Sequence, residues 1–217
     1  MNTVKVVGSF IEIPLTPPTS SDCDIIEIRL DAQLKLSEVT EFLQTTEQAK
    51  LFVARDPKEG GLNPEFSSPT SRMEALREVL SMADYIDIEK NNWSQMQPIL
   101  EDAINLNCKT IASYHDFSKT PSYEELESLL EHALSTDADI LKFAFMIREN
   151  EDIDRCLALL QRHQGLPISI MGMGALGAKS RILLGKAGSL LNYGFLGSKE
   201  TAPGQISATE LKRKLLA

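Results

Sequence analysis

Short runs of apolar and β-branched residues recur along the whole chain, separated by longer segments in which polar and apolar positions mix. The runs predict eight strands, at residues 4–10, 24–31, 50–56, 85–90, 109–116, 139–146, 167–173 and 190–197. Most of the intervening segments have the length and the start signals of helices. Strands that alternate with helices pair in parallel through right-handed crossovers, and eight such units close into a barrel. The pattern therefore predicts a (β/α)8 TIM barrel, with residues 1–217 forming a single domain.

Three of the predicted helices begin with a serine that is followed three residues later by a glutamate. This capping box satisfies free backbone amides at a helix start. The pairs are Ser71 with Glu74, Ser122 with Glu125, and Ser207 with Glu210. The first crossover differs, because residues 11–22, "IEIPLTPPTSSD", are rich in Pro, Ser and Thr and show no helical pattern. We expect this crossover to be a loop.

Polar residues within the predicted strands fall on one side of each strand. Side chains two positions apart face the same side of a sheet, so Ile26 and Ile28 are expected to face the helices and their neighbours the barrel interior. The polar residues expected inside are Glu27, Arg29, Asp31, Asp87, Glu89, Ser113, His115 and Lys142. Barrel interiors are usually filled by branched apolar side chains, and catalytic groups gather at the carboxyl ends of the strands. The placement indicates a candidate site at that end.

Lys142 and His115 are the strongest candidates for chemistry, and each also has an ordinary structural interpretation. Lys142 lies within the apolar run "ILKFAF", and a lysine is almost never fully buried without a partner. It is either half of an ion pair with Glu89 or Asp87, or an amine that burial and nearby arginines keep neutral and nucleophilic toward carbonyl groups. A single histidine at a strand end, such as His115, is more often structural than catalytic.

Two loops at the same end of the predicted barrel add further polar groups. The segment "RDPKEGG" places Arg55 and Glu59 around a Gly-Gly turn. The segment "ETAPGQIS" places Thr201 and Gln205 around a Pro-Gly turn before the last helix, where they would lie over the mouth of the barrel. Each loop is either a solvated surface loop or part of a binding site.

The composition narrows the class of partner. The formal net charge of -9 opposes general attraction to nucleic acid or to an anionic membrane, and so favours a small-molecule partner. The three cysteines are far apart, form no C-x-x-C pair, and are expected to be reduced. The sequence contains neither a signal segment nor an apolar run of about 18 residues, so we expect a soluble, cytoplasmic protein.

The segment "ISIMGMGALGAKSR" contains Gly172, Gly174 and Gly177 at the G-x-G-x-x-G spacing of a dinucleotide-binding loop. That fold also needs an acidic residue about 20 positions later to hold a ribose. Glu200 lies near that distance, but its surroundings are turn-forming, and too little chain follows for the fold to continue. We therefore expect the glycines to shape tight turns, with a phosphate bound at the turn as an alternative.

Five motifs, in matching order and spacing across nearly the whole chain, resemble those of the type I 3-dehydroquinate dehydratases. They are "EIRLD", "RDPKEGG", "ASYHD", "DILKFAFM", and "SR" followed by "APGQIS". The resemblance implies a (β/α)8 lyase that removes water from 3-dehydroquinate to give 3-dehydroshikimate, a step of the shikimate pathway toward chorismate. It implies no metal and no organic cofactor, and it fits a homodimer.

The resemblance also implies roles for individual residues. Lys142 is implied to form a Schiff base with the substrate, His115 to act as general acid and base, and Glu89 to support both electrostatically. Arg181 is implied to clamp the substrate carboxylate. The full set of implied substrate-binding residues is Glu27, Arg29, Arg55, Glu59, Met171, Met173, Arg181, Thr201 and Gln205.

The residues alone leave two other functions open. A class I aldolase would share Lys142 and the barrel, but would bind a phosphate at the glycine turn rather than a carboxylate at Arg181. A non-catalytic barrel that binds metabolites would use Lys142 only in an ion pair.

Domains of the family that the chain resembles also occur fused to a shikimate dehydrogenase, so the sequence fits either a whole protein or the front part of a fusion.

Overall fold

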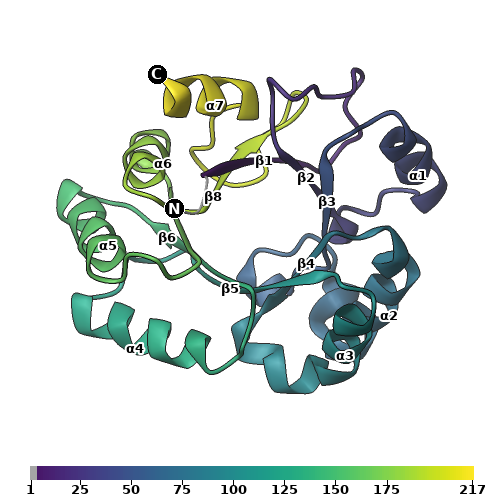
Figure 1. The fold of residues 1–217 in the computed structure, drawn as a ribbon, viewed down its shortest axis with the longest axis horizontal. Coiled ribbons are helices and arrows are strands. Elements are labelled where there is room, and N and C mark those ends of the chain that lie inside the picture. The colour runs from purple at the N-terminus through teal and green to yellow at the C-terminus, as the bar shows by residue number, and fades with distance from the viewer. Residues whose placement is uncertain (1–3) are drawn as a thin grey trace.

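The computed structural model describes residues 4–217, and within them eight parallel strands surround a common axis (Figure 1). The strands are β1 (Lys5–Phe10), β2 (Ile25–Arg29), β3 (Ala49–Val53), β4 (Tyr85–Glu89), β5 (Lys109–Asp116), β6 (Ile140–Met146), β7 (Ile168–Met173) and β8 (Leu191–Phe195). Their order in the sheet is β7-β6-β5-β4-β3-β2-β1-β8. All the predicted strands are present, and the predicted (β/α)8 barrel is confirmed.

The seam of the barrel lies between β7 and β8, the two ends of the strand order. The backbone N–H of Leu190 donates to the carbonyl of Ile168 at 2.9 Å. The N–H of Leu191 donates to the hydroxyl of Ser169, also at 2.9 Å. A serine hydroxyl therefore takes the place of a backbone acceptor where the barrel closes.

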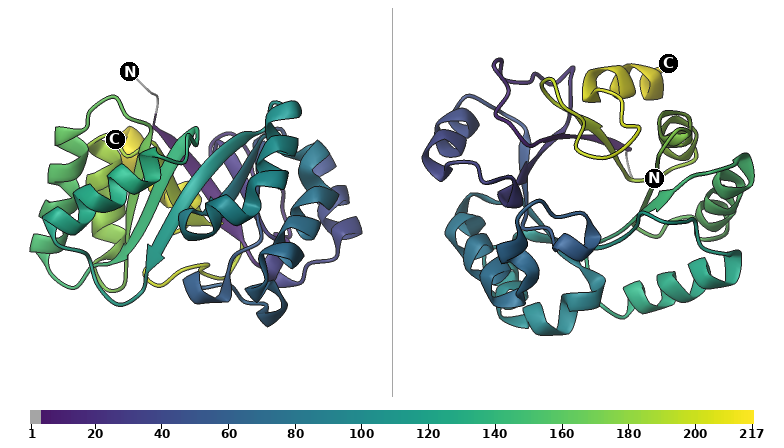
Figure 2. Two further views of the ribbon diagram at one scale, coloured as in Figure 1. Left: turned by 90° about the horizontal axis from the view of Figure 1, so that it is seen from below. Right: turned by 180° about the vertical axis from the view of Figure 1, so that it is seen from behind.

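Helices form an outer layer around the strands, as the side view shows (Figure 2). They are α1 (Leu36–Gln44), α2 (Pro69–Val79), α3 (Gln97–Asn105), α4 (Tyr123–Leu134), α5 (Asn150–Arg162), α6 (Gly177–Lys186) and α7 (Ala208–Leu216). The first crossover, between β1 and β2, contains no helix, as predicted. Within residues 4–217, no helix is both long enough and apolar enough to cross a bilayer.

Two of the three predicted helix starts are correct. Ser122 and Glu125 form a reciprocal capping box at α4. The Ser207 hydroxyl accepts the N–H of Glu210 at the start of α7. The start predicted at Ser71 is wrong, because α2 already begins at Pro69, with Ser68 as its N-cap. Proline suits the first helical position, since the amide that it lacks would have no partner there.

Apolar side chains pack in two layers on the two sides of the strands. Ile26 and Ile28 belong to the outer layer, beneath the helices, as the alternation predicts. The inner layer fills the amino half of the barrel with Val7, Ile25, Leu51, Tyr85, Ile111, Ile140 and Leu191. The polar interior residues come later in their strands, so the barrel interior becomes polar toward its carboxyl end.

Short 3-10 segments supplement the helices, at η1 (Leu30–Ala32), η2 (Pro57–Glu59), η3 (Pro64–Ser67), η4 (Leu80–Met82) and η5 (Lys90–Met96). The segments η2 and η3 (blue) and the loop after β8 (yellow) lie together at one end of the barrel (Figure 2). These segments come after the carboxyl ends of β3 and β8, so they surround the carboxyl mouth of the barrel.

Candidate active site

A cavity of about 220 Å³ lies at the carboxyl end of the barrel. Its lining comprises Glu27, Arg29, Arg55, Glu59, Gly60, His115, Phe117, Lys142, Ala144, Met171, Arg181, Tyr193, Thr201, Pro203 and Gln205. All the predicted site residues are in this set except Glu89 and Met173. Pockets for drug-sized ligands usually start at about 300 Å³. The smaller volume of this cavity fits a small metabolite.

A larger hollow, of about 670 Å³, lies between the first crossover and the loop after β8. Its lining among the described residues is mainly proline, leucine and threonine, and it includes no lysine, arginine, histidine or cysteine. The carboxylate of Glu12 there is paired with Lys199, and both side chains are exposed. Ionisable groups converge only in the smaller cavity of the two, so that cavity is the candidate active site.

Lys142 stands on β6 with its side chain inside the barrel and is 3% exposed. Its register neighbours are two small residues, Ser113 on β5 and Ser169 on β7, which leave room for a nucleophile deep in the barrel. Its Nζ lies 2.8 Å from Oδ2 of Asp87 and 3.7 Å from Oε1 of Glu27. The partner in the expected ion pair is therefore Asp87 rather than Glu89.

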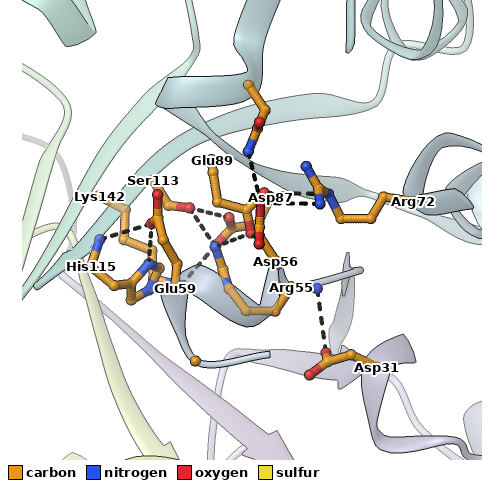
Figure 3. Close-up of polar contacts among 12 residues, drawn as sticks. Asp31, Arg55, Asp56, Glu59, Arg72, Asp87, Glu89, Ser113, His115 and Lys142 are labelled. Carbon is orange, nitrogen blue, oxygen red and sulfur yellow. Dashed lines mark hydrogen bonds and ion pairs between the residues drawn. The ribbon is translucent and has the colours of Figure 1, made fainter. Parts of the chain in front are cut away.

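His115, on the adjacent strand β5, contacts a carboxylate from the β3–α2 loop. Its Nδ1 lies 3.1 Å from Oε2 of Glu59, and its backbone N–H donates to the same oxygen at 2.9 Å (Figure 3). Burial, assisted by the charges of Arg55 and Lys142, holds the pKa of His115 well below its ordinary value. Burial also raises the pKa of Glu59 to about 8, against the opposing effect of Arg55. The pair is therefore a neutral imidazole beside a protonated carboxyl group at neutral pH.

The structure gives Glu89 different neighbours from those expected. Its Oε1 accepts hydrogen bonds from the guanidinium of Arg55 and the backbone N–H of Asp56, each at 3.0 Å. Its Oε2 lies 3.8 Å from Nε of Arg72. Glu89 is outside the cavity lining, and the carboxylate that contacts His115 is Glu59. The strand position of Glu89 is as predicted, but the two arginines draw its carboxylate away from the lysine and the histidine.

Asp87 links the lysine to the arginine of the site. Its carboxylate lies 2.8 Å from Nζ of Lys142 and 2.8 Å from the guanidinium of Arg55, and it accepts the hydroxyl of Ser113 at 2.5 Å. Burial alone would raise the pKa of Asp87, but Arg55 and Lys142 outweigh it and hold this pKa well below the ordinary value. Figure 3 shows Lys142, His115 and Glu59 on one side of this network and Arg72 on the other.

Arg29 lies at the mouth of the cavity and is held by Asp31. Its Nε and Nη2 donate to the two oxygens of Asp31 at 2.8 and 2.6 Å, and Nη2 also donates to the carbonyl of Gly60. Asp31 in turn accepts the backbone N–H of Leu62 at 2.9 Å. This bidentate pair fixes the β3–α2 loop, and with it Glu59, to the end of β2.

Arg181 is a buried cation with an unbonded hydrogen-bond donor. It is 1% exposed, and its Nη1 donates to the backbone carbonyl of Tyr193 at 2.6 Å. Its Nε has no hydrogen-bond partner, and no carboxylate within residues 4–217 forms an ion pair with it. Burial lowers the pKa of Arg181 to about 10, a value at which it still carries its charge at neutral pH. Such a guanidinium is suited to bind an anionic group of a ligand.

The loop after β8 brings Thr201 and Gln205 to the cavity. The side-chain Oε1 of Gln205 accepts the backbone N–H of Thr201 at 2.9 Å and its hydroxyl at 2.8 Å. The same loop packs on the start of α6. The N–H of Gly174 donates to the carbonyl of Pro203 at 3.0 Å, and a Cβ on Gly177 would lie 2.9 Å from the carbonyl oxygen of Gly204.

The glycines of the G-x-G-x-x-G spacing serve three different packing needs. Gly174, at φ +85°, is the tight-turn residue that was predicted. Gly172 is not in a turn: it lies within β7, where a Cβ would overlap the hydroxyl of Ser180 on α6. Gly177 opens α6 beneath the loop after β8. The amides of Gly174 and Gly177 are both bonded to carbonyls within the chain, which argues against a phosphate site at this turn.

The two methionines of β7 differ in position. Met171 lines the cavity, as predicted. Met173 is buried in the inner apolar layer and is not part of the lining. Within residues 4–217, no group of three or more His, Cys, Asp or Glu side chains is arranged to hold a metal ion.

Sequence reasoning missed several residues of this region. Tyr193 faces the cavity from β8, and Phe117 stacks near His115 with ring centroids 6.5 Å apart. The alternation that placed Lys142 inside its strand also identifies Tyr193, which is two positions from the inward-facing Leu191. No local signal marks Arg72, which reaches Asp56 and Glu89 from helix α2.

Comparisons with known proteins point to one family. A family model described as type I 3-dehydroquinase matches residues 12–216. The 3-dehydroquinate dehydratase of Thermodesulfovibrio yellowstonii is 33% identical over 193 residues, which cover 87% of this chain and 82% of the relative. The enzyme of the same name from Methanocaldococcus jannaschii is 34% identical over 211 residues, with coverages of 96% and 90%.

A solved structure gives the same likeness. The type I 3-dehydroquinate dehydratase of Clostridium difficile, determined with covalently modified comenic acid, is 27% identical and has a TM-score of 0.80. The likeness covers 100% of this chain and 92% of that one.

Proposed function

The chain belongs to the type I 3-dehydroquinase family, and on this premise we propose that it removes water from 3-dehydroquinate to give 3-dehydroshikimate. The reaction is a step of the shikimate pathway toward chorismate and the aromatic amino acids. We further propose that it proceeds through an imine between Lys142 and the substrate ketone. The observation that carries this mechanism is a buried lysine amine and a neutral histidine that line one small cavity.

The imine supplies the electron sink that the reaction needs. A proton next to a ketone is too weakly acidic for an imidazole to remove at neutral pH. Attack by Nζ of Lys142 on the ketone carbon, followed by loss of water, gives a protonated imine that accepts the electrons of the breaking C–H bond. Lys142 attacks as a neutral amine, and the proton that its ammonium form loses is returned when the carbinolamine hydroxyl leaves as water.

His115 is the group suited to carry protons in the later steps. As a neutral imidazole it removes the proton from the carbon next to the imine. As an imidazolium it then returns a proton to the hydroxyl that leaves from the adjacent carbon. Glu59, bonded to Nδ1 and to the backbone N–H, orients the ring throughout. Hydrolysis of the imine releases the product and restores Lys142.

Binding of the substrate carboxylate is assigned to Arg181, whose guanidinium has an unbonded Nε. Arg29, Arg55, Glu27, Thr201 and Gln205 line the same cavity and are the groups available to its hydroxyls. A class I aldolase would need a phosphate site instead, and the bonded amides of Gly174 and Gly177 do not offer one. The covalently modified ligand in the Clostridium difficile structure is consistent with covalent chemistry in this family.

The experiment that tests the proposal combines turnover with imine trapping. Purified protein should convert 3-dehydroquinate to a product whose conjugated enone absorbs in the ultraviolet. Borohydride added during turnover should leave a stable adduct on the peptide that contains Lys142. Lys142→Ala should lose both the adduct and the activity, whereas Lys109→Ala, at the exposed amino end of β5, should keep both.

His115→Ala separates proton transfer from imine formation. It should lose most of its turnover but still give the adduct, because the amine of Lys142 remains. An active protein that gives no adduct would overturn the imine mechanism, as would an adduct on another lysine. A protein that forms no product at all would favour the non-catalytic metabolite-binding barrel.

A further inference from the structure

Tyr193 is a buried tyrosine whose hydroxyl has no partner. It stands on β8, is 3% exposed, and lines the candidate active site. Its hydroxyl makes no hydrogen bond to any group within residues 4–217. Buried hydroxyl groups are normally paired, because an unpaired one loses its bonds to water and gains nothing in return. A hydroxyl of this kind inside a binding cavity marks a position at which a ligand atom completes the bond.

Tyr193 contacts two groups that the proposed reaction uses. The Nζ of Lys142 lies 4.2 Å from the centroid of the Tyr193 ring. The guanidinium of Arg181 donates to the backbone carbonyl of Tyr193, and all three residues line the same cavity. A ring substrate that extends from Lys142 to Arg181 therefore passes Tyr193.

We propose that the Tyr193 hydroxyl is a substrate-binding group that donates a hydrogen bond to a ring hydroxyl of the bound substrate. The proposal rests on the proposed function. In that reaction the substrate carboxylate pairs with Arg181, and the ketone oxygen leaves as water when the imine forms on Lys142. The oxygens left for Tyr193 are those of the hydroxyl groups.

The electrostatics of the site keep Tyr193 in the form that can donate. Burial, together with the negative charges of Glu27 and Asp87, holds the pKa of Tyr193 well above its ordinary value. The phenol is therefore protonated across the range in which the enzyme would work. Its ring face, against Nζ of Lys142, also suits a cation at that atom, such as the protonated imine.

Tyr193→Phe tests the proposal, because it removes only the hydroxyl and keeps the ring against Lys142. One neutral hydrogen bond made equally in the ground and transition states predicts a rise in KM of roughly 3- to 10-fold, with kcat changed by less than about 2-fold. Borohydride should still trap the adduct on Lys142 at saturating substrate. The melting temperature without ligand should stay the same or rise, since the variant no longer buries an unpaired hydroxyl.

Tyr85→Phe is the matched control, because Tyr85 belongs to the same inner layer but lies at the amino end of the barrel. It should leave KM unchanged. An unchanged kcat/KM in Tyr193→Phe would overturn the proposal, and so would a lower melting temperature without a change in KM, which indicates a structural bond. If the unaltered protein does not turn over 3-dehydroquinate, the proposed function fails and this inference fails with it. Turnover by the unaltered protein with no effect of Tyr193→Phe refutes only the role of Tyr193.

Discussion

The pairing of His115 with Glu59 makes the stability of the protein depend on pH in one narrow range, and Glu59→Gln should remove that dependence. In the unfolded chain these groups titrate near their ordinary pKa values of 6.5 and 4.5. In the folded chain the pKa of His115 is far lower, and burial raises the pKa of Glu59 to about 8. The folded pair therefore holds one proton, on Glu59, until the pH approaches 8.

The sign and size of the effect follow from counting protons. Between pH 4.5 and 6.5 the unfolded chain also holds one proton on this pair, on His115, so the pair leaves stability unchanged there. Between pH 6.5 and about 8 the folded state holds one proton more, and the free energy of unfolding falls as pH rises. Over about 1.5 pH units, at about 1.4 kcal/mol per unit, the loss is about 2 kcal/mol.

Urea unfolding followed by the fluorescence of the single tryptophan, Trp93, measures this loss between pH 6 and 9. Glu59→Gln has an uncharged amide in place of the protonated carboxyl group, so it should show no decrease above pH 6.5. Glu127→Gln is the matched control, since Glu127 forms a glutamate–histidine pair with His163 at the surface and should leave the decrease intact. A flat profile in the unaltered protein, or an undiminished decrease in Glu59→Gln, would refute the proton count.

Two further predictions concern substrate binding. Arg181→Ala should lower kcat/KM by about 30- to 1000-fold in steady-state assays, mainly through KM, because a charged hydrogen-bonded clamp contributes roughly 2 to 4 kcal/mol; an unchanged value would remove Arg181 from the site. If the loop carrying Thr201 and Gln205 is a lid, trypsin cleavage after the exposed Lys199 should slow at saturating 3-dehydroshikimate. Cleavage after the exposed Lys35 is the control, and equal slowing, or none, at Lys199 would contradict a lid.

The alternation of polar and apolar residues was sufficient to predict the barrel and its polar interior. It placed Lys142 and His115 on adjacent strands and facing inward, because the two-residue period of a strand is a local property. The lack of a helix in the first crossover also follows from a local signal, because a segment rich in Pro, Ser and Thr disfavours a helix. These features need no knowledge of how distant segments meet.

The pairing of charges could not be predicted in this way. Glu59 lies at the end of η2 and Glu89 at the end of β4, both near the barrel mouth. The sequence does not say which of the two carboxylates reaches His115. The answer depends on Arg72, a helix residue that holds Asp56 and approaches Glu89 from behind the site. Gly172 shows the same limit. A glycine is required there because a Cβ would overlap the hydroxyl of Ser180 on the next helix, and the sequence around Gly172 does not reveal that contact.

The contact between the start of α6 and the loop after β8 has a consequence for selectivity. Gly174 is bonded to Pro203, and Gly177 lies close beneath Gly204, so the helix that bears Arg181 and the loop over the mouth are one mechanical unit. Under the proposed function, an acid group held by Arg181 would act through these backbone contacts on the loop over the mouth. A ketone without an acid group would reach Lys142 without contacting Arg181, and so without acting on the loop. The enzyme would then select its substrate through an acid group that takes no part in bond making or breaking.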